Sequence, residues 1–197
     1  MNDADHQVYL ASRSPRRREL LRQIGVRFAV VEGDADETRL PGEHPEDYVL
    51  RLAVAKARAA RALIPHHDRR PVLGADTAVV VGEQILGKPE TREESLAMMQ
   101  LLSGRAHRVL TAVALISVDG ERTDLSESRV TFRTLDDSEA LGYWRTGEPH
   151  DKAGGYAIQG YGALFVSALN GSYSGVMGLP LFETGRLLAQ VGIEVMQ

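Results

Sequence analysis

The segment Val-Leu-Gly-Ala-Asp-Thr-Ala-Val-Val-Val at residues 72–81 constrains the fold more than any other part of the chain. It is apolar and rich in β-branched residues, and only Gly74 and Asp76 interrupt it. Such a run is typical of a strand that is buried on both faces. The dipeptide Asp119-Gly120 between two apolar stretches adds a strong hairpin signal. Separated strands together with hairpins predict an α/β protein with a mixed sheet.

Hydrophobic periodicity and capping residues predict the other elements. Ser14 is a plausible N-cap with Pro15 at the first helical position, and Thr91 with Glu94 forms a capping-box pattern. Asp136 or Asp137 caps the helix that ends at Gly147. We expect strands at 8–11, 26–31, 72–81, 84–86, 109–118, 122–134 and 163–169, and helices at 15–25, 45–63, 91–103, 136–147 and 180–192.

Composition limits the kind of protein. The 197 residues predict a single domain spanning 1–197, and 43% hydrophobic with 25% charged residues is ordinary for a globular protein. A net charge of −4 disfavours nucleic-acid binding. The lack of cysteine excludes disulfides and thiolate nucleophiles. No apolar run approaches the ~18 residues of a membrane span, and the start lacks a signal-peptide pattern. We therefore expect a cytoplasmic protein that binds neither nucleic acid nor membrane.

Basic side chains and hydroxyls gather where the first predicted helix begins. Ser12 and Ser14 precede Arg16, Arg17 and Arg18. Arginines at the positive end of a helix dipole are locally unfavourable, and a bound anion would relieve the conflict. The segment therefore predicts an anion site, and the alternative is an ordinary solvated helix face.

Two charged residues stand at apolar positions. At about 100° per residue, Lys56 falls in the middle of the apolar stripe of its helix, so its ammonium either extends to solvent or meets an acidic partner. Asp76 interrupts the buried strand, where a carboxylate is costly unless it is paired or binds a metal. We favour a functional role for Asp76 over a purely structural pairing.

Three weaker signals complete the candidates. Asp36 and Glu37 lie in a polar loop and, with Asp76, could supply oxygen ligands for Mg²⁺ or Mn²⁺. Residues 82–89 approach the P-loop pattern, but Pro89 replaces the required hydroxyl, so only Lys88 remains as a possible phosphate contact. Gln159, in a glycine-rich segment, could read a base edge or be an exposed amide in a tight turn.

Four ordered motifs together resemble the Maf family of nucleoside triphosphate pyrophosphatases. They are Ser-Arg-Ser-Pro-Arg-Arg at 12–17, Gly-Ala-Asp-Thr at 74–77, Gly-Lys-Pro at 87–89 and Asp-Lys-Ala-Gly-Gly-Tyr-Ala-Ile-Gln-Gly at 151–160. Arg13 departs from the small residue that is common in the family. The family's relation to inosine triphosphate pyrophosphatases implies an elongated mixed β-sheet with flanking helices and two lobes around a central cleft.

The resemblance also implies a chemistry. Arg16, Thr77 and Gln159 are similar to the marks of the branch that hydrolyses dTTP and UTP to the monophosphate and pyrophosphate. Asp76 matches the general base, and Glu37 with Asp76 matches a site for Mg²⁺ or Mn²⁺. The substrate-binding positions are Ser12, Ser14, Arg16, Arg17, Lys56 and Lys88. The family implies a homodimer with a house-cleaning role.

The sequence is also compatible with three other functions. The chain could be a nucleotide-binding regulator of cell division and septum formation with little turnover. It could be a purine-selective house-cleaning pyrophosphatase, or a phosphate-binding structural domain without chemistry.

Overall fold

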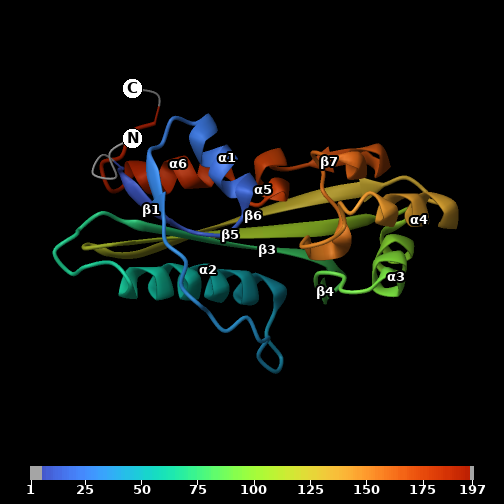
Figure 1. Ribbon diagram of the computed structural model, residues 1–197, viewed down its shortest axis with the longest axis horizontal. Helices are drawn as coiled ribbons and strands as arrows, with labels where there is room; N and C mark the ends of the chain where they lie inside the picture. The colour runs from blue at the N-terminus through green and yellow to red at the C-terminus, as the bar shows by residue number, and fades with distance from the viewer. Residues whose placement is uncertain (1–5, 196–197) are drawn as a thin grey trace.

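The computed structural model describes residues 6–195 as a single mixed sheet with helices on both faces (Figure 1). Strand order is β2-β1-β3-β5-β6-β7, and β4 pairs with β3 outside this path. The strands are β1 (Val8–Ala11), β2 (Phe28–Val30), β3 (Val72–Val81), β4 (Gln84–Leu86), β5 (Ala106–Ser117), β6 (Gly120–Phe132) and β7 (Val166–Asn170). The expected α/β class and mixed sheet are confirmed, because β1 runs parallel to β2 and β3 whereas every other pair is antiparallel.

The helices cover the sheet in three groups. α2 lies alone on one face, α1, α5 and α6 cover the other, and α3 and α4 lie at one end of the molecule (Figure 1). They are α1 (Pro15–Gln23), α2 (Pro45–Ala62), α3 (Arg92–Leu102), α4 (Asp137–Arg145), α5 (Tyr173–Met177) and α6 (Leu181–Ala189). Among residues 6–195, no helix has both the length and the apolar character needed to cross a bilayer.

The elongated shape gives three separate hydrophobic clusters. One joins α2 to β3 and β5, and a second joins α1 and α6 to the opposite face of the same strands. The third joins α3 and α4 to the far ends of β3, β5 and β6. β3 contributes to all three clusters, since its side chains alternate between the two faces. The buried strand predicted at 72–81 is therefore the centre of the molecule.

Capping predictions are confirmed, and most boundaries shift by a few residues. Ser14, Thr91 and Asp136 cap α1, α3 and α4 through their side chains. The strand expected at 163–169 is wrong in its first half, because Tyr161–Phe165 forms a 3-10 helix before β7 begins. α5 was not predicted, since a five-residue helix containing a glycine shows no usable periodicity.

Part of one edge of β3 has no neighbouring strand among the described residues. β1 pairs with β3 only as far as Gly74, and β4 begins to pair with the same edge at Val79. β5 pairs with the other edge along the whole stretch between them. One edge of β3 is therefore free at residues 75–78, which include Asp76 and Thr77.

α2 approaches β3 closely at Gly74. A Cβ atom placed on Gly74 would lie 2.4 Å from the Ala53 carbonyl oxygen and 2.9 Å from the Ala57 amide nitrogen. Only glycine fits this contact, because the neighbouring atoms belong to the helix backbone. The contact brings the middle of α2 against the strand just before Asp76.

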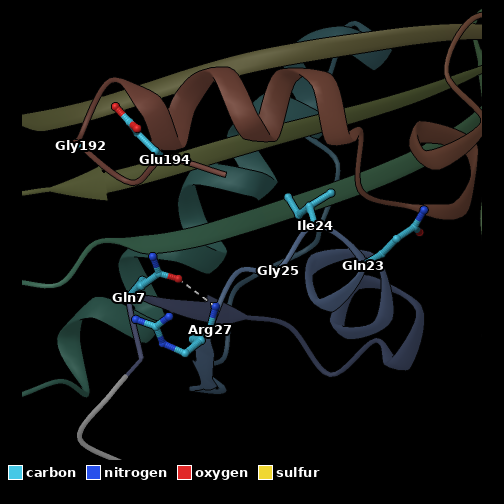
Figure 2. Close-up of a pocket in the computed structure, with 7 residues that line it drawn as sticks. All are labelled: Gln7, Gln23, Ile24, Gly25, Arg27, Gly192 and Glu194. Atoms are coloured by element: carbon cyan, nitrogen blue, oxygen red, sulfur yellow. Dashed lines mark hydrogen bonds between the residues drawn. The ribbon is translucent and has the colours of Figure 1, made fainter. Parts of the chain in front are cut away.

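Away from this open edge of β3, a hollow of about 810 Å³ lies at the other end of β1, where α1 and α6 end (Figure 2). Gln7 and Arg27 line it, and the Gln7 side chain accepts a hydrogen bond from the Arg27 amide at 3.0 Å. It shares no residue with the opening beside β3.

Gly74→Ala should lower the free energy of unfolding by about 1–3 kcal/mol, because the added methyl group forces α2 away from β3. Gly185→Ala is the matched control, since a Cβ at this α6 position meets no atom within 4 Å. The control should raise stability by about 0.5–1 kcal/mol. Urea denaturation of both variants measures the difference, and a Gly74→Ala protein as stable as the wild type would contradict the close contact.

Candidate functional site: a cleft at the open edge of β3

A cleft of about 880 Å³ opens at the unpaired edge of β3. It gathers residues from β1, the start of α1, the loop after β2, α2, β3, the loop after β4, the glycine-rich segment 151–160 and the end of α5. All ten of the predicted site residues line it: Ser12, Ser14, Arg16, Arg17, Glu37, Lys56, Asp76, Thr77, Lys88 and Gln159. The convergence that the sequence predicted is therefore present in space.

The alternation of β3 sends its two polar side chains in opposite directions. Asp76 points toward the face covered by α2, and Thr77 points toward the face covered by α1. Because the strand edge is open between β1 and β4, both side chains also border the same cleft. The unpaired edge of β3 therefore lets side chains from the α2 face and the α1 face of the sheet reach the same cleft.

Lys56 links the two acidic residues of the cleft. Its ammonium nitrogen lies 2.6 Å from Asp76 Oδ1 and 2.7 Å from Glu37 Oε1. Asp76 is buried, with 7% of its surface exposed, whereas Glu37 lies on the exposed loop after β2. The Lys56 side chain therefore meets acidic partners instead of extending into solvent, which resolves the alternative left by the sequence.

The pKa values of the two acids move in opposite directions. Burial raises the pKa of Asp76, although the positive charges of Lys56 and Arg17 oppose the effect. Partial burial also acts to raise the pKa of Glu37, but the hydrogen bond and charge of Lys56 outweigh it and lower that pKa. The site therefore holds one carboxylate with increased proton affinity beside one that stays ionised.

Arg17 is held by neutral acceptors. Its Nε donates to the Gly178 carbonyl at 2.7 Å, its Nη2 to Thr77 Oγ1 at 3.1 Å and its Nη1 to Ser12 Oγ at 3.4 Å. Burial lowers the pKa of Arg17, and the charge of Asp76 partly compensates.

The two serines serve the start of α1. Ser12 Oγ accepts from the Ser14 amide, and Ser14 Oγ accepts from the Arg17 amide. Their hydroxyls shape the loop that carries Arg16 and Arg17 into the cleft.

Four cationic side chains in the cleft form no ion pair with any residue of the described part of the chain. They are Arg16, Arg17, Lys88 and Lys152. Burial lowers the pKa of Arg16 and of Lys152, so both are partly removed from water. Unpaired cations in a partly buried cleft favour a bound anion of high charge.

The sequence did not single out Lys152, Tyr48 or Tyr156, which also line the cleft. Lys152 lies in the glycine-rich segment that was singled out for Gln159, so its charge was a usable signal. Tyr48 donates from its hydroxyl to the Glu37 carbonyl at 3.1 Å and thereby holds the loop. Tyr156 bonds to buried His107 at 2.8 Å, a contact that no sequence pattern predicts.

Arg13, the departure noted in the first motif, also borders the cleft, but its charge is paired. It is 75% exposed and pairs with Glu32 and Asp34 on the loop after β2. A large residue is tolerated at this position because its side chain is mostly exposed and finds acidic partners on that loop.

The donor set of Glu37 and Asp76 suits a divalent cation. Both carboxylates already converge on one positive group, the Lys56 ammonium, and both offer hard oxygen ligands. Within residues 6–195, no three His, Cys, Asp or Glu side chains form a complete metal cage. Mg²⁺ sites in proteins typically use one or two carboxylates together with water and substrate phosphates.

The fold and the cleft define an α/β protein in which unpaired cations and a buried carboxylate line one cleft. The chain belongs to the Maf family: residues 7–191 match the family of Maf-like proteins.

Relatives are similar over nearly the whole chain. A dTTP/UTP pyrophosphatase of Alkalilimnicola ehrlichii is 56% identical over 190 residues, which cover 95% of this chain and 94% of the relative. A dTTP/UTP pyrophosphatase of Saccharophagus degradans is 52% identical, covering 100% of this chain and 93% of the relative. The solved structure of the Staphylococcus aureus Ham1 protein is more distant, with a TM-score of 0.44 and 18% identity over 66% of this chain and 72% of that one.

Lys56→Met should raise the pKa of Asp76 further, because the variant removes a positive charge and a hydrogen bond that both lower it. The pKa of Glu37 should rise as well, since Lys56 supplies its main stabilising contact. Carboxyl ¹³C chemical shifts followed against pH measure both values. Arg58→Met is the control, because Arg58 pairs with Glu121 on the outside of α2. An unchanged Asp76 pKa in Lys56→Met would contradict the pairing.

Proposed function

We propose that this chain is a nucleoside triphosphate pyrophosphatase that hydrolyses dTTP and UTP to the monophosphate and pyrophosphate. The observation that carries the proposal is the set of four unpaired cations that line the same cleft as the Lys56–Asp76–Glu37 cluster. A triphosphate tail bears several negative charges and matches that set. The relatives named dTTP/UTP pyrophosphatase support the same activity and the pyrimidine preference.

In the proposed reaction, a water oxygen attacks the α-phosphorus of the substrate. Asp76 accepts the proton of this water, and its raised pKa suits a general base. The bond between the α-phosphorus and the bridging oxygen to the β-phosphate breaks, and pyrophosphate leaves with that oxygen. Arg16, Arg17, Lys56 and Lys88 stabilise the negative charge on the tail and on the leaving group.

Metal dependence is part of the proposal. Glu37 and Asp76 would hold Mg²⁺ or Mn²⁺ together with phosphate oxygens, and the ion would supply charge neutralisation at the phosphates. Lys56 already holds both carboxylates at one position, which supports this assignment.

Base recognition is assigned to Gln159, Thr77 and Arg16. Gln159 is exposed at the cleft and carries both a donor and an acceptor for a pyrimidine edge. Ser12 and Ser14 act at the start of α1, where main-chain N–H groups favour phosphate.

The proposed enzyme has one catalytic domain and acts in the cytoplasm. Residues 1–197 act as one catalytic domain, and the enzyme works as a cytoplasmic homodimer with a house-cleaning role. The lack of cysteine fits a reducing compartment, and the net charge of −4 fits a protein that does not bind nucleic acid.

The test is a substrate panel of dTTP, UTP, CTP and inosine triphosphate, with pyrophosphate release measured in Mg²⁺, Mn²⁺ or EDTA. We expect turnover of dTTP and UTP with equal amounts of monophosphate and pyrophosphate, loss in EDTA and recovery when metal is added. Preference for inosine triphosphate would favour the purine-selective alternative. Nucleotide binding without turnover would favour a regulator of cell division.

Asp76→Asn should reduce turnover of the preferred substrate by at least ~100-fold, because the amide cannot accept the water proton. Its free energy of unfolding at pH 7 should not fall. The folded state raises the pKa of Asp76, so ionisation costs stability as pH rises through that value, and a neutral amide removes this cost.

Asp36→Asn is the matched control for this variant. Asp36 neighbours Glu37 in the same loop but does not line the cleft, and an asparagine oxygen can still accept the hydrogen bond from the Thr38 amide. The control should keep wild-type turnover. Near-normal turnover of Asp76→Asn would remove Asp76 from its proposed role.

A further inference from the structure

A chain of hydroxyl contacts leads from the cleft into the core. Thr77 on β3 and Thr111 on β5 are cross-strand partners, and their Oγ1 atoms lie 3.1 Å apart. Thr111 is wholly buried and does not line the cleft. Its hydroxyl donates to the Gly175 carbonyl at 2.8 Å, so this series of hydrogen bonds ends on the main chain of α5.

At its other end, this series of hydrogen bonds reaches the guanidinium of Arg17. Thr77 Oγ1 accepts from Arg17 Nη2, while Arg17 Nε donates to the Gly178 carbonyl at the end of α5. The contacts therefore close a ring that runs from α1 through β3 and β5 to α5 and back to α1. Thr111 is the only member of the ring whose side chain lies wholly in the core.

The ring of contacts leaves some N–H groups of Arg17 without an acceptor in the described part of the chain. A guanidinium has five N–H groups. Arg17 uses one on Gly178, one on Thr77 and one on Ser12, so two N–H groups have no acceptor among the described residues. Each of the two Nη atoms carries one of them, which leaves a pair suited to two oxygens of a phosphate.

Gly178, at the end of α5, allows the main chain to lie close to Arg17 and Thr77. Gly178 has a φ of 117°, which disfavours other residues, and a Cβ there would lie 3.4 Å from Arg17 Nε and 3.6 Å from Thr77 Oγ1. The carbonyl and the two side chains are thus held in close contact, and little freedom remains for the guanidinium plane.

We propose that Thr111 is a positioning residue, which acts through Thr77 and Gly175 to fix the plane of Arg17 so that its two remaining N–H groups face the substrate phosphates. The inference rests on the proposed function, because it assigns Arg17 to the triphosphate tail. Thr111 itself touches no substrate.

Steady-state kinetics on dTTP with three variants test the proposal at a temperature well below every melting point. Thr111→Val keeps the shape and removes the hydroxyl, and we expect kcat/KM to fall about tenfold. Thr111→Ser keeps the hydroxyl and should restore kcat/KM to within about twofold of wild type. Thr184→Val is the control, since Thr184 is equally buried but its hydroxyl has no hydrogen-bond partner in the described structure. A Thr111→Val enzyme as active as Thr184→Val would overturn the proposal.

A second measurement does not depend on activity. In ¹⁵N spectra, the Arg17 Nε–H of the wild type should exchange slowly with water, as should that of Thr111→Ser, whereas Thr111→Val should show faster exchange. Equal exchange in Thr111→Val and wild type would also overturn the proposal. A wild-type enzyme that hydrolyses no nucleotide would instead refute the proposed function, and the exchange measurement would still decide the role of Thr111.

Discussion

The site depends on the ion pairs that allow a carboxylate to lie within an apolar strand. Asp76 is buried at the centre of β3, and Lys56 of α2 compensates its charge at 2.6 Å. The pair forms only if α2 lies very close to β3, and Gly74 permits that contact. Because Lys56 also binds Glu37, the same ammonium anchors an exposed loop to the core of the protein. Packing, charge balance and loop position are thus coupled through one side chain.

The cleft exists because of strand lengths. β1 stops at the level of Gly74, and β4 starts at the level of Val79. The intervening edge of β3 exposes both faces of the strand to one opening, so α2 delivers Lys56 from one side and α1 delivers Arg17 from the other. A β1 strand longer by four residues would close this edge and separate the two sets of side chains.

Two cations in the cleft, Arg17 and Lys152, are held by uncharged partners. Arg17 donates to a carbonyl and two hydroxyls, and Lys152 donates to the His150 carbonyl. These contacts orient the side chains without neutralising their charge. A cleft arranged in this way is organised for an anionic ligand before the ligand arrives, which reduces the cost of ordering side chains on binding.

The sequence by itself determined the buried strand at 72–81, the caps at Ser14 and Thr91, and the polar side chains that belong to the cleft. These features follow from local rules, because an ionisable group in an apolar run or a hydroxyl before a helix has few acceptable environments. It did not determine α5, the 3-10 turn before β7, or the contacts of Lys152 and Thr111. Those depend on contacts between residues far apart in the chain: Thr111 meets Gly175 only because β5 passes beneath α5. Only the tertiary structure decided which partner Lys56 would find, since the distance between α2 and β3 is set by packing and not by the pattern of either segment.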